Sequence, residues 1–259
     1  MKKKVRIIPG FGLSMGVTLS LLSLVVLIPL ASLVVFTAKM DLSSIIEVIT
    51  KPRVAASFKV SLLTALIASL VNAVMGVVLA WVLVRYDFPL KRLLDGMIEL
   101  PFALPTAVAG ISLTSLYAYT RLGIIVALIF VGIPFVVRAV QPVLEKLDPL
   151  YEEAAGILGA SRAQIFRKVI FPELRPAIFT GFGLAFGRCL GEYGSVVFIA
   201  GNKPFETEIT PLIIMSELQE FDYSSATAIA LVMLAAAFLI LFLVNLIQIR
   251  NSKILKGGH

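Results

Sequence analysis

Long apolar stretches alternate with short polar ones along most of this chain. Six stretches are each about as long as the 20 residues that a helix needs to cross a bilayer. They fall at roughly 13–36, 60–84, 97–118, 122–144, 177–200 and 225–248, with ends uncertain by 2–4 residues. The third contains Pro101 and Pro105 near its start, which a span tolerates where neighbouring helices satisfy the freed carbonyls. The pattern predicts an all-α membrane protein of about six transmembrane helices, forming one domain over residues 1–259.

The composition supports a lipid environment. Of the 259 residues, 59% are hydrophobic and 15% are charged, whereas a soluble domain carries about 25% charged residues. Most of the 23 lysines and arginines fall on the side of both termini and of the loop between the fourth and fifth spans. Five fall on the other side, namely Lys39, Lys51, Arg53, Arg121 and Lys203. Because cytoplasmic loops carry this excess, we expect both termini and that loop to be cytoplasmic. The net charge of +7 then reflects topology, and no basic stripe favours nucleic acid.

The cytoplasmic loop over 145–176 is polar and contains two helix signals. Asp148 precedes Pro149, which predicts an N-cap followed by proline at the first helical position. Gly159 suits a left-handed helix stop. Ser161 and Gln164 form a capping-box pattern. We therefore expect a helix, a tight turn and a second short helix that ends before Pro172.

This loop has two possible roles. Ala154 and Ala155 offer a surface that another protein can approach closely, and Glu153 can pair with a basic partner. The alternative is an amphipathic helix that rests on anionic headgroups through Arg162, Arg167 and Lys168. The acidic residues Glu152 and Glu153, and the absence of a large aromatic face, favour the protein partner. The chain contains no phosphate-binding G-x-x-x-x-G-K-[ST] run, so any ATP hydrolysis that drives it would belong to another subunit.

The fifth predicted span carries the unusual intramembrane residues. Gly183, Gly187 and Gly191 recur every four residues, which favours close helix contact within the subunit or across a dimer axis. Arg188 and Glu192 are also four apart and can pair. The pair is either a structural lock for the helix or a fixed cation along an anion path, since charges at this depth usually serve function.

Little else in the sequence indicates an enzyme. Cys189 is the only cysteine and His259 the only histidine, so cysteine clusters and most hydrolase sites are excluded. We expect no metal and no cofactor bound by this chain. The predicted outer loop over 201–224 is acidic, and it is either a solvated loop or part of a docking surface for a substrate-delivering protein.

One spaced motif resembles the EAA loop of ATP-binding-cassette (ABC) importer permeases. It consists of Glu153, Ala154, Ala155, Gly159, Val169, Phe171 and Pro172, with valine and phenylalanine where that family more often has isoleucine and leucine. Residues 99–113, 133–161, 191–208 and 221–248 are further similar to the sulfate/thiosulfate permease subunits of such importers.

The resemblance implies a permease without enzymatic activity that works in the cytoplasmic membrane of a bacterium. It implies an ATPase dimer that uses MgATP, a second permease subunit (CysW-like) or a second copy of this chain, and an extracytoplasmic sulfate-binding protein. The residues implied for ATPase coupling are Asp148, Glu152, Glu153, Ala154, Ala155, Gly159 and Pro172. The fifth span would line the pathway, with Arg188, Glu192 and Tyr193 as candidates. Molybdate or tungstate is the alternative cargo, because tetrahedral dianions use related machinery.

Overall fold

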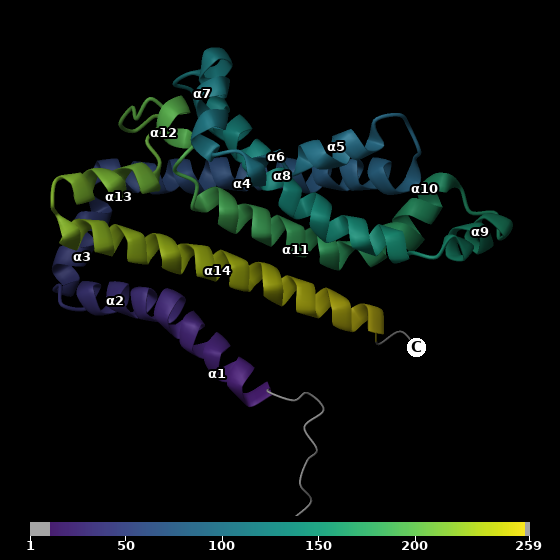
Figure 1. The fold of residues 1–259 in the computed structure, drawn as a ribbon, viewed down its shortest axis with the longest axis horizontal. Helices are drawn as coiled ribbons and strands as arrows, with labels where there is room; N and C mark the ends of the chain where they lie inside the picture. Colours follow the sequence, from purple (N-terminus) through teal and green to yellow (C-terminus); the bar gives the residue numbers. More distant parts are fainter. Residues whose placement is uncertain (1–10, 257–259) are drawn as a thin grey trace, which may run out of the picture.

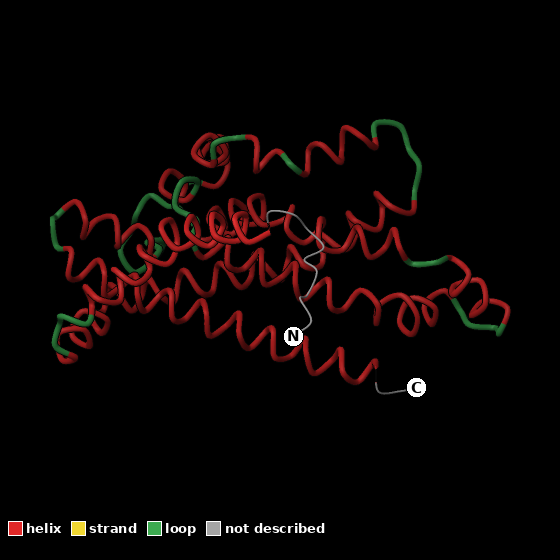
Figure 2. Tube along the Cα trace, turned by 60° about the horizontal axis from the view of Figure 1, so that its bottom comes forward, coloured by secondary structure: helices red, strands yellow, loops and turns green. Residues whose placement is uncertain are grey.

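The computed structural model describes residues 11–256, and these consist of helices joined by loops, with no strand among them (Figures 1 and 2). The elements are α1 (Phe11–Leu22), η1 (Ser23–Leu27), α2 (Ile28–Thr37), α3 (Leu42–Thr50), α4 (Pro52–Arg85), α5 (Lys91–Ile98), α6 (Leu100–Ala103), α7 (Thr106–Tyr117), α8 (Arg121–Lys146), α9 (Pro149–Ile157), α10 (Arg162–Ile165), η2 (Phe166–Ile170), α11 (Phe171–Leu190), α12 (Val196–Ile199), α13 (Thr210–Gln219) and α14 (Tyr223–Lys256). The elements η1 and η2 are π-helical turns. Within the described residues, five helices are long and apolar enough to cross a membrane.

Three of the long helices, α4, α8 and α11, pack on one another and form the centre of the molecule. Small residues such as Ala65, Ala68 and Ala80 are fully buried there. In lipid, helices associate through close packing of small side chains, because burial away from lipid gives no hydrophobic gain. The helix α14 lies along α11, and α2 lies along α14 at the edge of the bundle (Figure 1).

The third predicted span is not one helix. Its residues are divided among α5, α6 and α7. Leu104 has an extended backbone (φ −93°, ψ 139°) because it precedes Pro105, whose ring disfavours the helical conformation of the residue before it. The 12 residues of α7 cover about 18 Å, less than the roughly 30 Å of bilayer hydrocarbon. The prediction of a continuous helix over 97–118 is therefore wrong.

The second helix of the cytoplasmic loop does not end before Pro172, so that prediction is also wrong. It continues through η2 into α11, as one helix over Arg162–Leu190. Within η2 the N–H of Phe171 donates to the carbonyl of Phe166, five residues back. The hydrogen-bond ladder is thus already widened at the point where Pro172 lacks an N–H.

The fifth span also ends earlier than predicted. The helix α11 stops at Leu190 with Gly191 as its C-cap, and the chain turns before α12 begins at Val196. The turn is packed tightly against α7. A Cβ on Gly110 would lie 2.3 Å from the carbonyl oxygen of Ser195.

The bundle has two distinct ends. The helices α9 and α10 lie at one end, and α3, α12 and α13 lie at the other (Figure 1). The predicted terminal charges Lys2, Lys3, Lys4 and Arg6, as well as His259, lie outside the described residues.

Candidate functional site

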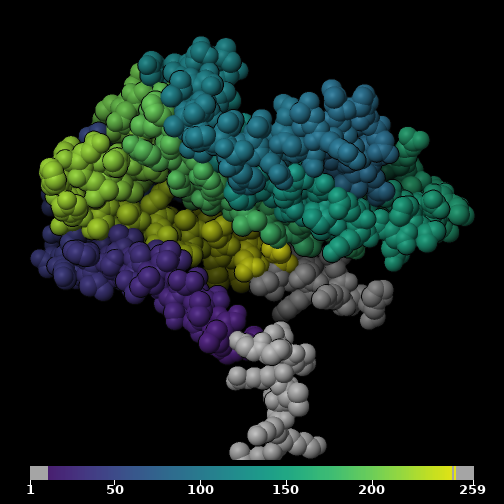
Figure 3. All heavy atoms as spheres, viewed as in Figure 1, coloured from purple at the N-terminus to yellow at the C-terminus, as the bar shows by residue number. Residues whose placement is uncertain are grey.

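The helix α9 protrudes from the end of the bundle (Figures 1 and 3), and both of its ends are closed by the predicted caps. The carboxylate of Asp148 accepts a hydrogen bond from the N–H of Leu150 at 3.0 Å. At the other end Gly159 has φ +83°, and the N–H of Ala160 donates to the carbonyl of Ala155 at 3.0 Å. This is the Schellman arrangement, which needs a residue that tolerates the left-handed conformation. The predicted helix and stop are confirmed.

The turn after α9 leads directly into a second cap. The hydroxyl of Ser161 accepts from the N–H of Gln164, and the side chain of Gln164 accepts from the N–H of Ser161 at 2.8 Å. The predicted capping box is confirmed. Local hydrogen bonds thus fix the shape of the whole 148–165 segment before any contact with the bundle is considered.

One face of α9 exposes apolar and acidic side chains together. Ile157 and Leu158 are 88% and 87% exposed, and Tyr151 is also exposed. Glu153 and Ala154 lie on the exposed surface as well, and Glu153 forms no ion pair within the described residues. A contiguous exposed apolar surface on a protruding element usually marks a protein interaction site. The arrangement suits a partner with an apolar groove and a basic rim.

The other face of α9 is tied to the end of α4. Glu152 forms an ion pair with Arg85, the last residue of α4, and both side chains are about three-quarters buried. The guanidinium of Arg85 also lies 5.4 Å from the ring centre of Trp81. Trp81 in turn meets Phe166 of η2 edge-on, with ring centres 5.8 Å apart. These contacts connect α9 to the end of α4 and, through Trp81, the end of α4 to η2.

Sequence reasoning missed Arg85, Trp81 and Phe166 as part of this site. Arg85 counted only as a charge on the cytoplasmic side, and 67 residues separate it from Glu152. Trp81 is the only tryptophan of the chain, which could have indicated a special contact. No spacing rule connects it with Phe166.

The remaining predicted loop residues line two cavities beside α9, of about 320 and 530 Å³. Ala155 and Gly159 line one of them, together with Gln164 and Lys168. Asp148 and Pro172 line the other, which places the two ends of the predicted loop in one site. Ala155 is half-buried and faces inward, so of the predicted alanine pair only Ala154 lies fully on the surface.

At the end of α11 the predicted ion pair is present, with Arg188 Nη1 2.6 Å from Glu192 Oε2 in the turn that follows the helix. Glu192 is only 2% exposed, and its Oε1 accepts from both the N–H and the hydroxyl of Ser195, at 2.8 and 2.9 Å. Both carboxylate oxygens are therefore occupied. Tyr193 is one-third exposed beyond the end of α11.

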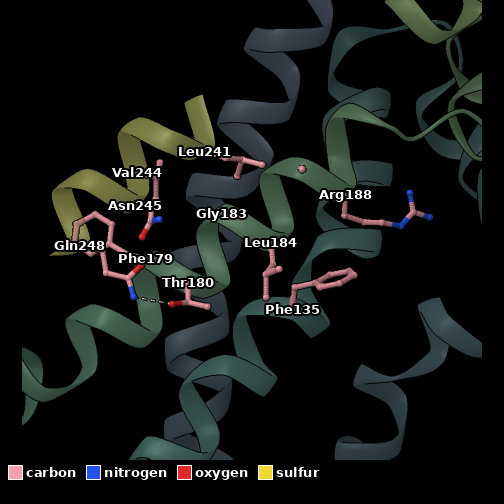
Figure 4. A pocket seen from close by; sticks show the side chains of 11 residues that line it. Phe135, Phe179, Thr180, Gly183, Leu184, Arg188, Leu241, Val244, Asn245 and Gln248 are labelled. Atoms are coloured by element: carbon pink, nitrogen blue, oxygen red, sulfur yellow. Dashed lines mark hydrogen bonds between the residues drawn. The ribbon is translucent and has the colours of Figure 1, made fainter. Parts of the chain in front are cut away.

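Arg188 lies at the edge of a groove of about 470 Å³ between α11 and α14 (Figure 4). The groove is lined by Phe135, Phe179, Thr180, Gly183, Leu184, Gly187, Arg188, Leu241, Val244, Asn245 and Gln248. Tyr193 and Glu192 do not line it. A Cβ on Gly183 or Gly187 would stand 3.5 or 3.8 Å from Leu241, which is ordinary contact. The predicted glycine ridge is thus not used for a close approach of α14, and Gly191 lies at the helix end.

The chain is similar to known transport proteins. The family model described as "Binding-protein-dependent transport system inner membrane component" matches residues 72–253. The chain is 50% identical over 269 residues to the "Sulfate transport system permease protein CysT" of Salmonella typhimurium strain LT2, with 97% of each covered. It is 51% identical to the protein of that name in Escherichia coli K12, with the same coverage, and 44% identical to that of Synechocystis, covering 90% of this chain and 87% of the relative.

Solved structures share the fold. The crystal structure of a bacterial ABC transporter involved in import of the acidic polysaccharide alginate gives a TM-score of 0.76 at 16% identity, with 93% of this chain and 96% of that chain covered. A second structure, in complex with an alginate pentasaccharide-bound periplasmic protein, gives 0.75 at 17% identity, with 92% and 93% covered.

Proposed function

This chain belongs to the family of binding-protein-dependent transport system inner membrane components, and we propose that it imports sulfate and thiosulfate. As a member of the family it is a multi-pass inner-membrane permease of an ABC transporter and is not itself the ATPase. The single observation that carries the sulfate assignment is the identity of about half of all positions to sulfate permeases over 97% of the chain.

The exposed face of α9 supports a mechanism for coupling. An ATPase dimer in the cytoplasm would receive Ile157, Leu158 and Tyr151 in an apolar groove, with Glu153 on a basic rim. MgATP binds and is hydrolysed there, and this chain holds no cofactor. When the two ATPase subunits close, α9 moves with them, and its ion pair with Arg85 transmits the displacement to α4. In this account both termini are cytoplasmic in a bacterial plasma membrane.

Two further partners complete the assembly. The groove between α11 and α14 is open along one side, and a second permease subunit or a second copy of this chain would close it. An extracytoplasmic sulfate-binding protein would dock at the end opposite α9 and deliver the anion. Cargo selectivity would rest largely with that protein, because buried hydrogen bonds discriminate oxyanions better than an open pathway does.

The Arg188–Glu192 pair suits transit of an anion. Glu192 neutralises Arg188 in part, so Arg188 would attract a passing oxyanion without holding it tightly. Loss of uptake by Arg188→Ala in a normally assembled transporter would support this role. Failure of the variant to assemble would instead show that the pair is a structural lock.

The cargo is tested by uptake into vesicles that carry this chain with its genomically neighbouring permease, ATPase and binding protein. Radiolabelled sulfate should accumulate only with ATP, and excess thiosulfate should block it while molybdate has little effect. Accumulation of molybdate in place of sulfate would show that the alternative, a molybdate or tungstate permease, is correct.

A further inference from the structure

A pocket of about 320 Å³ lies between α4 and α8 in the half of the bundle opposite α9. Two cationic side chains line it, Lys59 from α4 and Arg121 from the start of α8. The rest of the lining is almost entirely apolar, with Phe205 of the 201–209 loop at its edge. None of its residues lines the groove that contains Arg188. The proposed function makes no use of this pocket.

The two cations stand at the height of a bilayer headgroup layer. Lys59 lies 26 residues before Arg85 on α4, which is about 39 Å along a helix. Arg121 lies 25 residues before Lys146 on α8, which is about 38 Å. A bilayer measures about 40–45 Å with its headgroups. When Arg85 and Lys146 lie at one headgroup layer, Lys59 and Arg121 therefore lie at the other.

The charge of both cations is left without an acidic partner in the described part of the chain. Arg121 donates from Nε to the carbonyl of Glu206 at 2.7 Å and from Nη2 to the carbonyl of Phe205 at 3.3 Å. These neutral acceptors hold the guanidinium in place but do not neutralise its positive charge. By contrast, the same loop neutralises the nearby Arg53 with the buried carboxylate of Glu208 at 2.5 Å. The loop thus neutralises the charge of Arg53 and orients the guanidinium of Arg121 toward the pocket.

The apolar lining decides which kind of anion fits. Leu63 and Ile67 continue from Lys59 along the exposed stripe of α4, and Ile125 follows Arg121 on α8. A free oxyanion would occupy only the cationic end of the pocket and would leave the apolar side chains of the lining without a partner. A molecule with a phosphate and an acyl chain matches both parts. We propose that the pocket binds a phospholipid of the leaflet opposite α9, with its phosphate between Lys59 and Arg121.

Native mass spectrometry of the full chain, released from nanodiscs of phosphatidylethanolamine and phosphatidylglycerol, tests this proposal. The chain should retain phosphatidylglycerol. In Lys59→Gln the retained fraction should fall about fivefold, the effect of losing one cation near a membrane surface. Lys59→Arg keeps the charge and should retain the lipid. Lys51→Gln is the matched control, because Lys51 is an exposed cation at the same end of the bundle that does not line the pocket.

Equal retention by Lys59→Gln and Lys51→Gln would overturn the proposal. A second arm distinguishes a lipid from a free anion: the lipid-free chain in detergent is titrated with inorganic phosphate and with sulfate. Binding of either ion that depends on Lys59, without retention of phosphatidylglycerol in the first arm, would show a free-anion site and would also overturn the proposal. Because neither arm requires ATP or uptake, failure here is separable from failure of the proposed function.

Discussion

Arg85 and Glu152 join the last residue of α4 to the first turn of α9 through an ion pair that is largely buried. The pair is the direct polar link between α9 and the helices of the bundle centre in the described part of the chain. Because α9 otherwise contacts only its neighbours α10 and η2 closely, we expect this link to couple a movement of α9 to α4.

Exchange of the two charges tests whether the pair transmits movement. Arg85→Glu or Glu152→Arg alone should lower ATP-driven uptake, since each loses a charged hydrogen bond of about 1.5–3 kcal/mol and sets like charges together. The double variant should recover most of the uptake, though not the contact of Arg85 with Trp81. Arg92→Glu is the control, because Arg92 is an exposed cation near the same end without an ion pair among the described residues. If the double variant is no better than the singles, the link does not carry coupling.

Replacing either of two glycines of the loop by alanine should change the stability of α9 in opposite directions. Gly159 has φ +83°, so Gly159→Ala should destabilise the turn by about 1–2 kcal/mol. Gly156 lies within α9 with open space around it, and Gly156→Ala should stabilise the helix by about 0.5–1 kcal/mol. Hydrogen exchange of the α9 amides in the chain alone should be faster in the first variant and slower in the second. The same exchange rates in both would refute the left-handed stop.

Replacement by alanine should also have different effects on stability at glycines on two faces of α11. A Cβ on Gly181 would lie 2.8 Å from the Cα of Val136, so Gly181→Ala should destabilise the chain by about 1–3 kcal/mol. A Cβ on Gly183 would meet only the side chains of Leu241 and Val244, at 3.5 and 3.9 Å, so Gly183→Ala should leave thermal unfolding of the chain alone nearly unchanged. If the Gly183 face packs against a second permease subunit, the yield of the assembled pair should nevertheless fall. Unchanged assembly would exclude close packing at that face.

Glu217 on α13 should make stability depend on pH. Partial burial, followed by repulsion from Asp222 and Glu220, raises the pKa of Glu217 above its ordinary value. The folded state then binds the proton more readily, so stability falls as pH rises from the ordinary glutamate pKa through the raised one. Glu217→Gln should remove this loss and stabilise the chain at neutral pH by about 0.2–1 kcal/mol. Thermal unfolding of both chains at acidic and neutral pH measures this difference in stability, with Glu206→Gln, a substitution at an exposed glutamate, as the control. An identical pH profile for Glu217→Gln and the unchanged chain would contradict the expectation.

The parts of the site that were predictable are those built from neighbours in sequence. The Asp148 cap and the Ser161–Gln164 box join residues two and three apart, and the stop at Gly159 joins residues five apart. The Arg188–Glu192 pair spans one helical turn. The position of the membrane helices also follows from apolar length alone, except where prolines and glycines interrupt it. Hydropathy does not distinguish a proline that a helix tolerates from a proline that ends the helix. The prediction of one continuous helix for the third span failed for this reason.

Contacts between distant segments could not be predicted in this way. Arg85 meets Glu152 because α4 and α8 run parallel, so that both helices end on the same side of the bundle and the loop after α8 begins near the end of α4. The packing of the turn that contains Glu192 against α7 likewise depends on how the broken third span brings α7 to this turn and to α12.

The most direct test of the account is a cross-link between α9 and the ATPase in the assembled transporter. Cys189 is the only cysteine and is buried, so Ile157→Cys would provide the accessible thiol for a thiol–amine reagent. We expect the ATPase subunit to be captured and ATP-driven sulfate uptake to stop when it is. Leu122→Cys, exposed at the opposite end of the bundle, should capture no ATPase. An active assembly in which Ile157→Cys captures no ATPase would show that energy does not enter through α9.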